Sequence, residues 1–372
     1  MITVLYAVPR LAVSRVAPKT TPRASSQTPS HVITLRAMGD MLAHDSIVSQ
    51  AKREKGYDFR GYFTDIAPRL RQADAIFCNP ETPVAGEQLG VSGYPTFNAP
   101  NEFARDLTGA GCTIINLATN HMYDKGQTGI DESRSVWHQQ PLLAMNGANS
   151  SSEQQREVSY FEKNGVKCAF IAFADFSNSP VSQSYSVNMY HDVALVTQLM
   201  TEARTHADIV IVSAHWGTED SSVVNQDQRD AAKLFARLGA DIVIGTGPHV
   251  LQTVERVAGN DGHTALVWYS IGNMLSSQLQ ANELTSVIAS MKISKVKGAY
   301  TVTAVEAIPT FMSYKWTAAD RAAERLAARS NLQLRTLKNA AGDIASMFPN
   351  ETYDSRRAFI SSTLGDLVTI KD

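Results

Sequence analysis

Short apolar runs recur along the chain from residue 31 onward, and most of them end in a glycine or a polar side chain. Runs of this kind are typical of strands that are buried in a sheet. The predicted strands lie within residues 31–40, 73–81, 112–121, 167–176, 207–217, 240–249 and 264–273. Helical spacing of apolar residues falls between several of them, at 103–110, 129–139 and 226–238. Strands that alternate with helices predict an α/β domain.

Two later segments have different patterns. Residues 287–312 alternate between apolar and polar positions, which predicts antiparallel strands and therefore either a mixed sheet or two sheets. Residues 318–348 are rich in Ala, Leu, Arg and Lys at helical spacing, which predicts one or two amphipathic helices packed on the main body. The pattern contains neither an internal repeat nor a linker that would divide the core.

Composition places the chain among ordinary soluble globular proteins. It has 372 residues, of which 44% are hydrophobic and 19% charged, enough for one large domain or two smaller ones. A formal net charge of −2 gives no reason to expect nucleic acid as a partner. The three cysteines, Cys78, Cys112 and Cys168, show no CxxC spacing, which argues against a disulfide framework or a thiolate zinc site.

The first thirty residues differ from the rest, because they contain no acidic residue and are rich in Ser, Thr and Pro. The apolar run at 2–8 is too short to span a bilayer, and no basic residues precede it as they would in a signal peptide. The alternatives are the remnant of an export signal, a misassigned start and a disordered tether. We favour the disordered tether over residues 1–30 and predict no transmembrane segment elsewhere.

Polar side chains with metal-binding capacity follow most of the predicted strands. A single such residue is more typical of a turn or of a hydrogen-bonded histidine than of a ligand. Here they recur, and in open α/β sheets the carboxyl ends of the strands line the ligand-binding crevice. Carboxylate, imidazole and amide groups together suit Mn²⁺, Zn²⁺ or Fe. The residues concerned are Asp40, His44, Asn79, Glu81, Asn120, His121, His215, His249 and Asn273.

Seven stretches of the sequence occur together in one order. They read MGDMLAHDSI, FCNPETP, FNAP, AGCTIINLATNHMYDKGQTGI, IVSAHWGTE, GADIVIGTGPHVLQTVE and WYSIGNML. With them the chain resembles, from about residue 32 to 311, the bacterial CapA (PgsA-like) family of capsule and poly-gamma-glutamate synthesis. The resemblance implies a four-layer α/β/β/α sandwich of the calcineurin-like metallophosphoesterase type with C-terminal helices packed on it. Together with the patterns above, it predicts a disordered tail at 1–30, a metallophosphatase-fold domain at 31–313 and a helical extension at 314–372.

The same resemblance implies roles for individual residues. Asp40 and Glu81 are expected to be metal-binding carboxylates, Asn120 an amide ligand, and His215 and His249 imidazole ligands. His44 is also expected at the metal, although it stands four residues after Asp40 where the phosphoesterase pattern has two. His121 is expected to be a general acid. Asp124 is expected to be catalytic as well, with a helix or turn cap as the alternative.

One loop departs from the family pattern. The family commonly has a second histidine just before the Pro-His pair, whereas this chain reads Gly-Thr-Gly-Pro-His at 245–249. Water, Asn79 or Thr246 would have to substitute, or a second metal would be bound weakly or not at all. The departure bears on two-metal hydrolysis and leaves the predicted fold unchanged.

Two functions are compatible with these patterns. The first is metal-dependent hydrolysis of a phosphoester or related bond, with one or two divalent ions (Mn, Zn, Fe or Mg). The second is a non-catalytic, polymer-binding or export component of a capsule-synthesis assembly. A nucleotide-binding enzyme is disfavoured because no GxGxxG or GxxxxGK[ST] loop follows any strand. The family further implies an anionic polymer or phosphoester substrate, membrane proteins of capsule synthesis as partners, and a location at the cell envelope.

Overall fold

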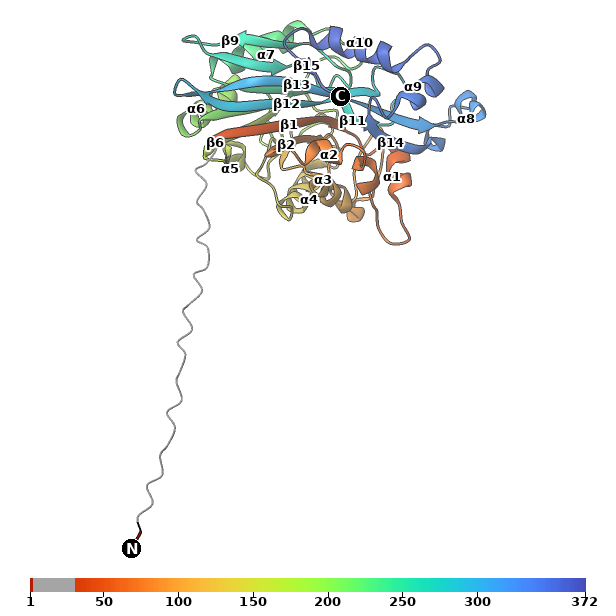
Figure 1. Cartoon of the computed structure of the whole chain (residues 1–372), viewed down its shortest axis with the longest axis horizontal. Helices are drawn as coiled ribbons and strands as arrows, with labels where there is room; N and C mark the ends of the chain where they lie inside the picture. Colours follow the sequence, from red (N-terminus) through yellow and green to blue (C-terminus); the bar gives the residue numbers. More distant parts are fainter. Residues whose placement is uncertain (3–30) are drawn as a thin grey trace.

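The computed structural model describes residues 1–2 and 31–372 of the chain (Figure 1). The prediction of a disordered tail over residues 1–30 falls almost entirely outside these described residues. Within them, none of the helices combines the length and the apolar character that a membrane crossing requires.

The first of two sheets has nine strands in the described chain and is mixed. Its strands are β1 (Val32–Met41), β2 (Ala75–Pro80), β3 (Ile114–Asn116), β4 (Ala144–Asn146), β11 (Asn273–Leu275), β12 (Thr285–Val296), β13 (Ala299–Lys315), β14 (Ser330–Thr336) and β15 (Thr369–Ile370). β1 to β4 are parallel, and β12, β13 and β14 pair antiparallel to their neighbours. The antiparallel pairing predicted for residues 287–312 is therefore confirmed.

The second sheet has six strands in the described chain, in the order β5-β6-β7-β8-β10-β9. They are β5 (Ser159–Lys163), β6 (Val166–Ala174), β7 (Ile209–His215), β8 (Ile242–Thr246), β9 (Val254–Ala258) and β10 (Thr264–Trp268). The central four are parallel, and antiparallel strands close both edges. The chain therefore has two sheets, and each of them is mixed.

Helices connect most of the parallel strands, as the alternating pattern predicted. The α-helices are α1 (Asp45–Ala51), α2 (Ala67–Leu70), α3 (Asn101–Ala110), α4 (Gly126–His138), α5 (Ser152–Gln155), α6 (Val193–His206), α7 (Gln226–Arg237), α8 (Ala318–Ala322), α9 (Ala341–Met347) and α10 (Tyr353–Leu364). Short 3-10 helices occur at Arg60–Phe63, Glu87–Leu89 and Leu326–Ala328. The predicted helices at 103–110, 129–139 and 226–238 correspond to α3, α4 and α7.

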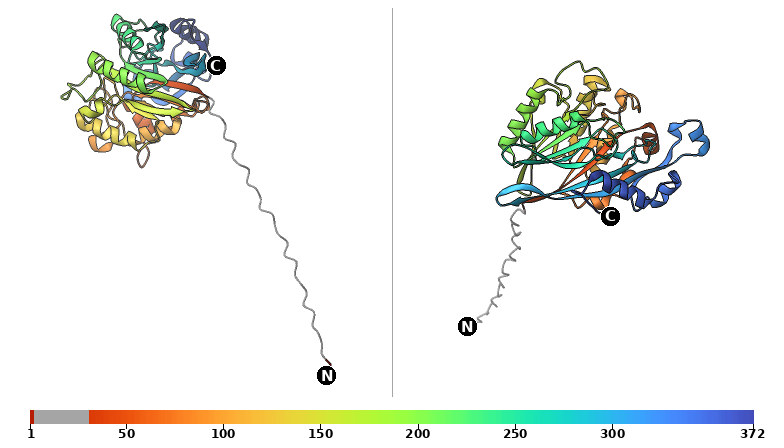
Figure 2. Two further views of the ribbon diagram at one scale, coloured as in Figure 1. Left: turned by 90° about the vertical axis from the view of Figure 1, so that its left-hand side faces the viewer. Right: turned by 90° about the horizontal axis from the view of Figure 1, so that it is seen from above.

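Side-chain alternation along β6 shows how the layers are stacked. Phe170 contacts Phe77 of β2 with ring centroids 6.0 Å apart, so this face of the second sheet packs on the first. Phe173 points to the opposite face and stacks at 5.6 Å on Phe235 of α7. On the outer side of the first sheet, Cys78 of β2 faces α3. Helices therefore cover the outer faces of two stacked sheets, and the predicted four-layer architecture is confirmed (Figure 2).

The segment predicted to be helical near the C-terminus is only partly so. β13 runs through the expected boundary at residue 313, and β14 lies within the segment predicted to form amphipathic helices. Leu332 and Leu334 of β14 are buried, two residues apart, so that this strand follows a period of two. The prediction of one or two amphipathic helices is met by α8 and α9 but is wrong for residues 330–336, where pairing with β13 overrides local helix propensity. α9 packs on β13, and α10 packs near β12.

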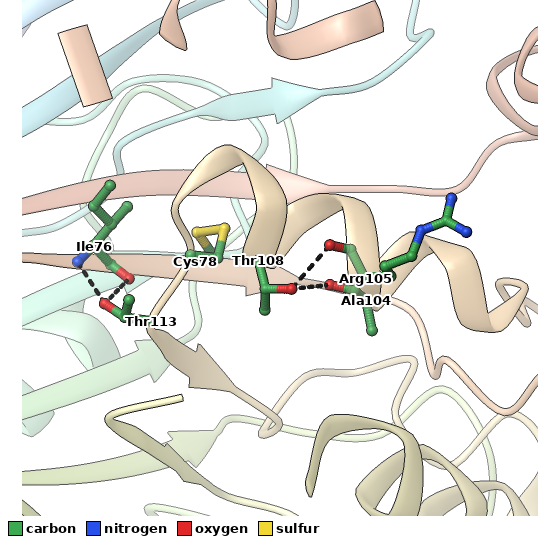
Figure 3. The surroundings of a disulfide bond; sticks show 7 residues. Ile76, Cys78, Ala104, Arg105, Thr108 and Thr113 are labelled. Carbon is green, nitrogen blue, oxygen red and sulfur yellow. Dashed lines mark hydrogen bonds between the residues drawn. A yellow bond between two sulfur atoms is a disulfide. The ribbon is translucent and has the colours of Figure 1, made fainter. Parts of the chain in front are cut away.

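A disulfide joins Cys78 of β2 to Cys112, just after α3 (Figure 3). The Cα atoms of the two cysteines are 5.8 Å apart, although 34 positions separate them in the sequence. The cysteine count did not predict this bridge. It depends on the pairing of β2 with β3, which places Cys78 opposite Ile115 and so brings the start of β3 beside it.

Thiol titration is expected to distinguish the three cysteines. Cys168 is buried, and burial raises the pKa of its thiol to about 12, helped by Asp208 and Asp241. The folded, oxidised protein should therefore show no thiol that reacts with a disulfide reagent at pH 8. Guanidinium alone should expose one thiol, and guanidinium with reductant should expose three. Three thiols without reductant would contradict the bridge.

Candidate metal centre

The carboxyl ends of parallel strands from both sheets meet at one place. Asp40 lies near the end of β1, Glu81 directly follows β2, and His215 is the last residue of β7. His249 lies three residues beyond β8. The backbone N–H of Gly247 donates to Asp40 Oδ2 over 3.1 Å, and this bond links the loop after β8 to β1. The fold thus brings together four of the predicted site residues from distant parts of the sequence.

Three of these residues form a compact cluster of ligand groups. Asp40, Glu81 and His249 each offer one ligand atom, and these atoms lie within 4.8 Å of one another. All three side chains are buried. Glu81 Oε1 lies 3.7 Å from Nε2 of His249 and also 3.7 Å from Nε2 of His215. The Glu81 carboxylate therefore lies between two imidazole rings.

Glu81 supplies the test of whether a cation fits this site. Its side chain has no exposure, and neither carboxylate oxygen has a hydrogen-bond partner among the described residues. Burial raises the pKa of its carboxyl well above the usual value. A buried carboxylate without partners is costly unless it is paired or coordinates a metal. A divalent cation beside Glu81 would supply the missing partner, and we conclude that the donor set fits one.

Asp40 and His249 are held in place by a network around them. Asp40 accepts hydrogen bonds from Asn79 Nδ2 (2.6 Å) and from the backbone N–H of Gly247, and His249 Nδ1 lies 3.2 Å from Asp40 Oδ2. His249 Nδ1 is also 3.0 Å from Oδ1 of Asn273. With Nδ1 engaged in this way, His249 presents Nε2 to Glu81. Such outer contacts fix the orientation of metal-binding histidines.

Burial and neighbouring charges have opposite effects on the pKa values of Asp40 and His249. Burial on its own raises the pKa of Asp40, but the contacts with His249, together with His215 and the N–H of Gly247, outweigh that effect and hold the pKa below the usual range. Burial likewise lowers the pKa of His249, and the nearby Glu81 and Asp40 carboxylates more than reverse this, raising it to about 10. In the metal-free protein, a proton on His249 therefore offsets the negative charge of the cluster, and a bound cation would take over that role.

His215 and Asn120 lie on the other side of Glu81. His215 Nε2 is 3.0 Å from Oδ1 of Asn120, and its Nδ1 is 3.0 Å from Oγ1 of Thr246. Burial lowers the pKa of His215 to about 4, so the ring is neutral at pH 7. Neutral imidazole is the form that binds metals. An amide oxygen, an imidazole and a shared carboxylate thus lie beside the first cluster.

The backbone is unusually close-packed under the site. The N–H of Asp40 donates to the carbonyl oxygen of Gly272, and a side chain at Gly39 would place its Cβ 1.8 Å from that same oxygen. His249 has φ of 62°, in the left-handed region that few non-glycine residues adopt. Glycine at position 39 and the strained backbone at 249 are consistent with a site whose geometry is held by its surroundings.

His121 and Asp124 form a separate pair next to Asn120. His121 Nδ1 lies 2.8 Å from Asp124 Oδ2, and both side chains are almost fully buried. Asp124 Oδ2 also accepts the backbone N–H of Phe97 over 2.8 Å. Asp124 does not cap α4, whose N-cap is Lys125. The alternative interpretation of Asp124 as a helix cap is therefore wrong. Its carboxylate contacts His121, and its catalytic role stays a prediction.

His44 is not part of the ligand cluster. Its Nδ1 accepts the backbone N–H of Ser277 at 3.4 Å, and its ring lies edge-on to Phe97 with centroids 5.6 Å apart. Burial lowers its pKa to about 3. The structure places His44 in the wall beside the centre, and its assignment as a ligand stays a prediction.

The two protein groups considered as substitutes for the missing histidine both have other partners. Thr246 Oγ1 bonds His215 Nδ1. Asn79 donates through Nδ2 to Asp40 and accepts through Oδ1 from Asn116 Nδ2 at 2.6 Å. Both residues therefore contact candidate ligands, and their role as substitutes stays a prediction.

Two supporting residues were not identified from the sequence. Asn116 holds Asn79, and Asn178 Nδ2 lies 3.2 Å from His121 Nε2. Asn116 lies in β3 between apolar residues, and a polar residue within such an apolar run was the only signal in the sequence. Asn178 lies in a loop after β6 that carries no recognisable pattern, and only the tertiary fold brings it to His121.

Comparison with known proteins supports the family that the seven stretches indicate. The sequence profile of the family described as "Bacterial capsule synthesis protein PGA_cap" matches residues 34–278, which is more than half of the chain. The chain is 28% identical to the "PGA biosynthesis protein CapA" of Bacillus subtilis (strain 168) over 251 residues, which are 66% of this chain and 64% of that protein. It is also 28% identical to the "Capsule biosynthesis protein CapA" of Bacillus anthracis over 290 residues, 74% and 68% of the two chains.

Two solved structures resemble it more distantly. A calcineurin-like phosphoesterase YfkN from Bacillus subtilis is 14% identical with a TM-score of 0.47, and the match covers 88% of this chain and 100% of that one. A hypothetical protein from Thermus thermophilus is 14% identical with a TM-score of 0.47, covering 74% and 98%. The chain spans about two thirds of the length of the two CapA relatives. From the extent of the profile match, this chain belongs to the bacterial capsule synthesis protein family PGA_cap.

Proposed function

We propose that this protein is a metal-dependent hydrolase that cleaves a phosphoester or a related bond in the synthesis of a capsule or poly-gamma-glutamate polymer. The observation that carries the proposal is the buried, unpartnered carboxylate of Glu81 between His215 and His249, with Asp40 beside them. A carboxylate with a purely structural role is normally hydrogen-bonded when it is buried, and neither oxygen of Glu81 has such a bond in the described chain. The CapA relatives, named for PGA and capsule biosynthesis, supply the polymer context.

Each residue has a defined part in this reaction. Asp40, Glu81 and His249 would hold one divalent cation, and Asn120 and His215 would complete its surroundings or hold a second. A divalent cation bound there would lower the pKa of water from about 15.7 towards about 7 and would stabilise negative charge on the reacting group. His121 lies outside the ligand cluster and can give a proton to the leaving oxygen. Asp124 keeps the His121 ring in position.

A second candidate function is supported by the departure in the loop after β8. With one histidine there, and with Thr246 and Asn79 engaged elsewhere, a full two-metal site lacks a protein ligand. The protein would then bind an anionic polymer without cleaving it, or would bind a membrane partner in polymer export. Both functions place it at the cell envelope, and a disulfide between Cys78 and Cys112 is typical of such oxidising surroundings.

One preparation tests the proposal. The purified protein is expected to contain divalent metal by elemental analysis and to hydrolyse a phosphodiester, or a γ-glutamyl polymer, in the presence of Mn²⁺. His215→Ala should reduce turnover at least about a hundredfold because it removes a ligand group. His206→Ala, an exposed histidine at the end of α6, is the matched control and should leave turnover unchanged.

The two functions give opposite results in this assay. Metal together with turnover that His215→Ala removes would exclude the binding-only function. Folded protein that takes up metal, binds the polymer and cleaves neither substrate would favour the second function. Folded protein that takes up no metal from an excess of Mn²⁺ or Zn²⁺ would overturn the proposed hydrolase.

A further inference from the structure

A cavity of about 280 Å³ lies beside the metal centre, and its position suggests a role in substrate binding. His44 forms part of its wall, and the ring of His44 contacts Phe97, which in turn lies edge-on to His121 with centroids 4.7 Å apart. Gln278, another wall residue, accepts a hydrogen bond from Asn273, whose Oδ1 is 3.0 Å from His249 Nδ1. The cavity is thus separated from a candidate ligand by a single side chain.

The cavity contains an arginine without an acidic partner. Arg329 follows the 3-10 helix Leu326–Ala328 and is only 9% exposed. Its Nε donates to the carbonyl oxygen of Leu326 over 2.7 Å, and its guanidinium packs between the rings of Tyr314 and Trp316. Within residues 31–372 its two terminal nitrogens make no hydrogen bond, and no carboxylate comes within ion-pair distance.

The terminal nitrogens of Arg329 are not among the fully buried atoms without a partner, so they are accessible from the cavity. A guanidinium group in such a position typically pairs with a carboxylate or phosphate. Burial lowers the pKa of Arg329, and Tyr314 and then Asp45 act in the opposite direction. An anionic ligand in the cavity would supply the missing partner, and a flat guanidinium can bind carboxylate or phosphate through two hydrogen bonds.

The acidic residue of the same cavity does not fill this place. Glu283 is also buried, but its Oε2 accepts the backbone N–H groups of Leu279 and Gln280 at 2.8 and 2.6 Å. Its carboxylate is therefore turned towards the loop before β12. Because Glu283 is satisfied there, it leaves the guanidinium of Arg329 available to a ligand.

The mouth of the cavity is apolar. Tyr94, Leu279 and Leu326 belong to its lining, and they are 76%, 43% and 47% exposed. They are among the few large hydrophobic side chains that the described chain leaves at its surface. An apolar mouth around a buried cation matches a ligand with an aliphatic chain that ends in, or carries, an anionic group.

We propose that this cavity, the Arg329 pocket, is a substrate subsite that binds an anionic group of the chain whose bond is cleaved at the adjacent metal centre. The inference rests on the proposed function and extends it to substrate recognition. Arg329 lies beyond residues 34–278, the part that the family profile matches, so the C-terminal segment of this chain contributes the cationic group of the pocket. The anionic group is an oxyanion, either a side-chain carboxylate or a phosphate.

Direct binding tests the subsite without requiring turnover. The full-length protein would be titrated calorimetrically with three probes: a short γ-linked glutamate oligomer, the same oligomer with its free α-carboxylates converted to amides, and phenyl phosphonate. We expect one of the two anions to bind, and the amide analogue to bind much more weakly. Arg329→Gln should weaken binding of that anion about ten- to hundredfold, because a charged hydrogen bond is lost. Which anion responds identifies the source of the oxyanion.

Two further variants separate charge from structure. Arg329→Lys keeps the charge without the planar fork and should bind between the wild type and Arg329→Gln. Arg325→Gln, an exposed arginine of the same segment that pairs with Asp320, is the matched control and should bind like the wild type. Thermal unfolding of all variants checks that each is folded. If Arg329→Gln unfolds, the comparison with Arg329→Lys carries the test.

The outcomes for the subsite and for the hydrolase are distinguishable. Binding of an anion that depends on Arg329, in a protein without turnover, supports the subsite while the proposed hydrolysis fails. Equal affinity of the wild type and the Arg329 variants for both anions, or no binding of either anion, overturns the subsite whether or not the protein is a hydrolase. In an active protein the loss should appear in KM and leave kcat nearly unchanged, since the subsite lies apart from the reacting atoms.

Discussion

Replacing Glu81 by glutamine is expected to abolish metal binding and, at the same time, to stabilise the metal-free protein. Glu81 is the buried carboxylate without a hydrogen-bond partner in the described chain. In metal-free protein at neutral pH, folding must either bury the charge of Glu81 or take up a proton there, because burial raises the pKa of this carboxyl. Glutamine removes that cost and should raise the free energy of unfolding by about 1–3 kcal/mol. With metal at about a thousandfold excess over its Kd the order reverses, because bound ligand then stabilises the wild type by about 4.1 kcal/mol.

Thermal unfolding with and without chelator measures both effects. Wild-type protein should lose stability when EDTA is added, whereas Glu81→Gln should be insensitive to EDTA. Glu87→Gln, at an exposed position, is the control and should behave like the wild type in both conditions. A metal-free Glu81→Gln protein that is clearly less stable than metal-free wild type would show that Glu81 has a structural partner and would remove the main support for a metal site.

The pH dependence of the same comparison has a definite sign. Burial raises the pKa of Glu81 in the folded protein above its ordinary value of 4.5. A folded state that holds this proton more tightly than the unfolded state is favoured below pH 4.5 and loses that advantage as the pH rises towards the folded pKa. Glutamine does not titrate. The stability of metal-free Glu81→Gln relative to metal-free wild type should therefore increase from pH 4.5 upward.

Local patterns were sufficient where burial is uniform along an element. Runs such as 207–217 and 240–249 identify β7 and β8 because central parallel strands are apolar throughout. β14 was mistaken for helix because its residues favour helix and only Leu332, Leu334 and Thr336 show the strand period. β14 pairs with β13, which lies nearby in the sequence, but this pairing depends on the tertiary structure and cannot be seen in the local pattern. The Cys78–Cys112 bridge was missed for the same reason.

The sequence predicts which residues form the site better than it predicts the contacts that each of them makes. The rule that parallel strands present their carboxyl ends to one crevice brought Asp40, Glu81, His215 and His249 together in advance. Sequence does not show that Asp40 is already bonded by Asn79 and Gly247 whereas Glu81 has no hydrogen-bond partner among the described residues. Arg329 could not be found in this way, since its significance lies in a partner that the described chain does not provide.

Substituting His121 by glutamine is expected to lower kcat about 10²- to 10⁴-fold while leaving the metal content unchanged. His121 lies outside the ligand cluster, so its loss should cost proton transfer and not metal affinity. Asp124→Asn should act in the same direction, because an amide that replaces the carboxylate no longer fixes the ring through the 2.8 Å contact. Elemental analysis and steady-state kinetics on the two variants and the wild type check both expectations.

The leaving group of the substrate decides whether His121 acts as a general acid or only as a positioning residue. A nitrophenolate leaves without a proton, whereas an alkoxide or phenolate of high pKa needs one in the transition state. If His121 supplies that proton, His121→Gln should slow a p-nitrophenyl ester only slightly and an alkyl ester by the full factor. An equal loss for both esters would contradict the general-acid role. The contact of His121 with Asn178 would then indicate that its ring instead orders the loop over the site.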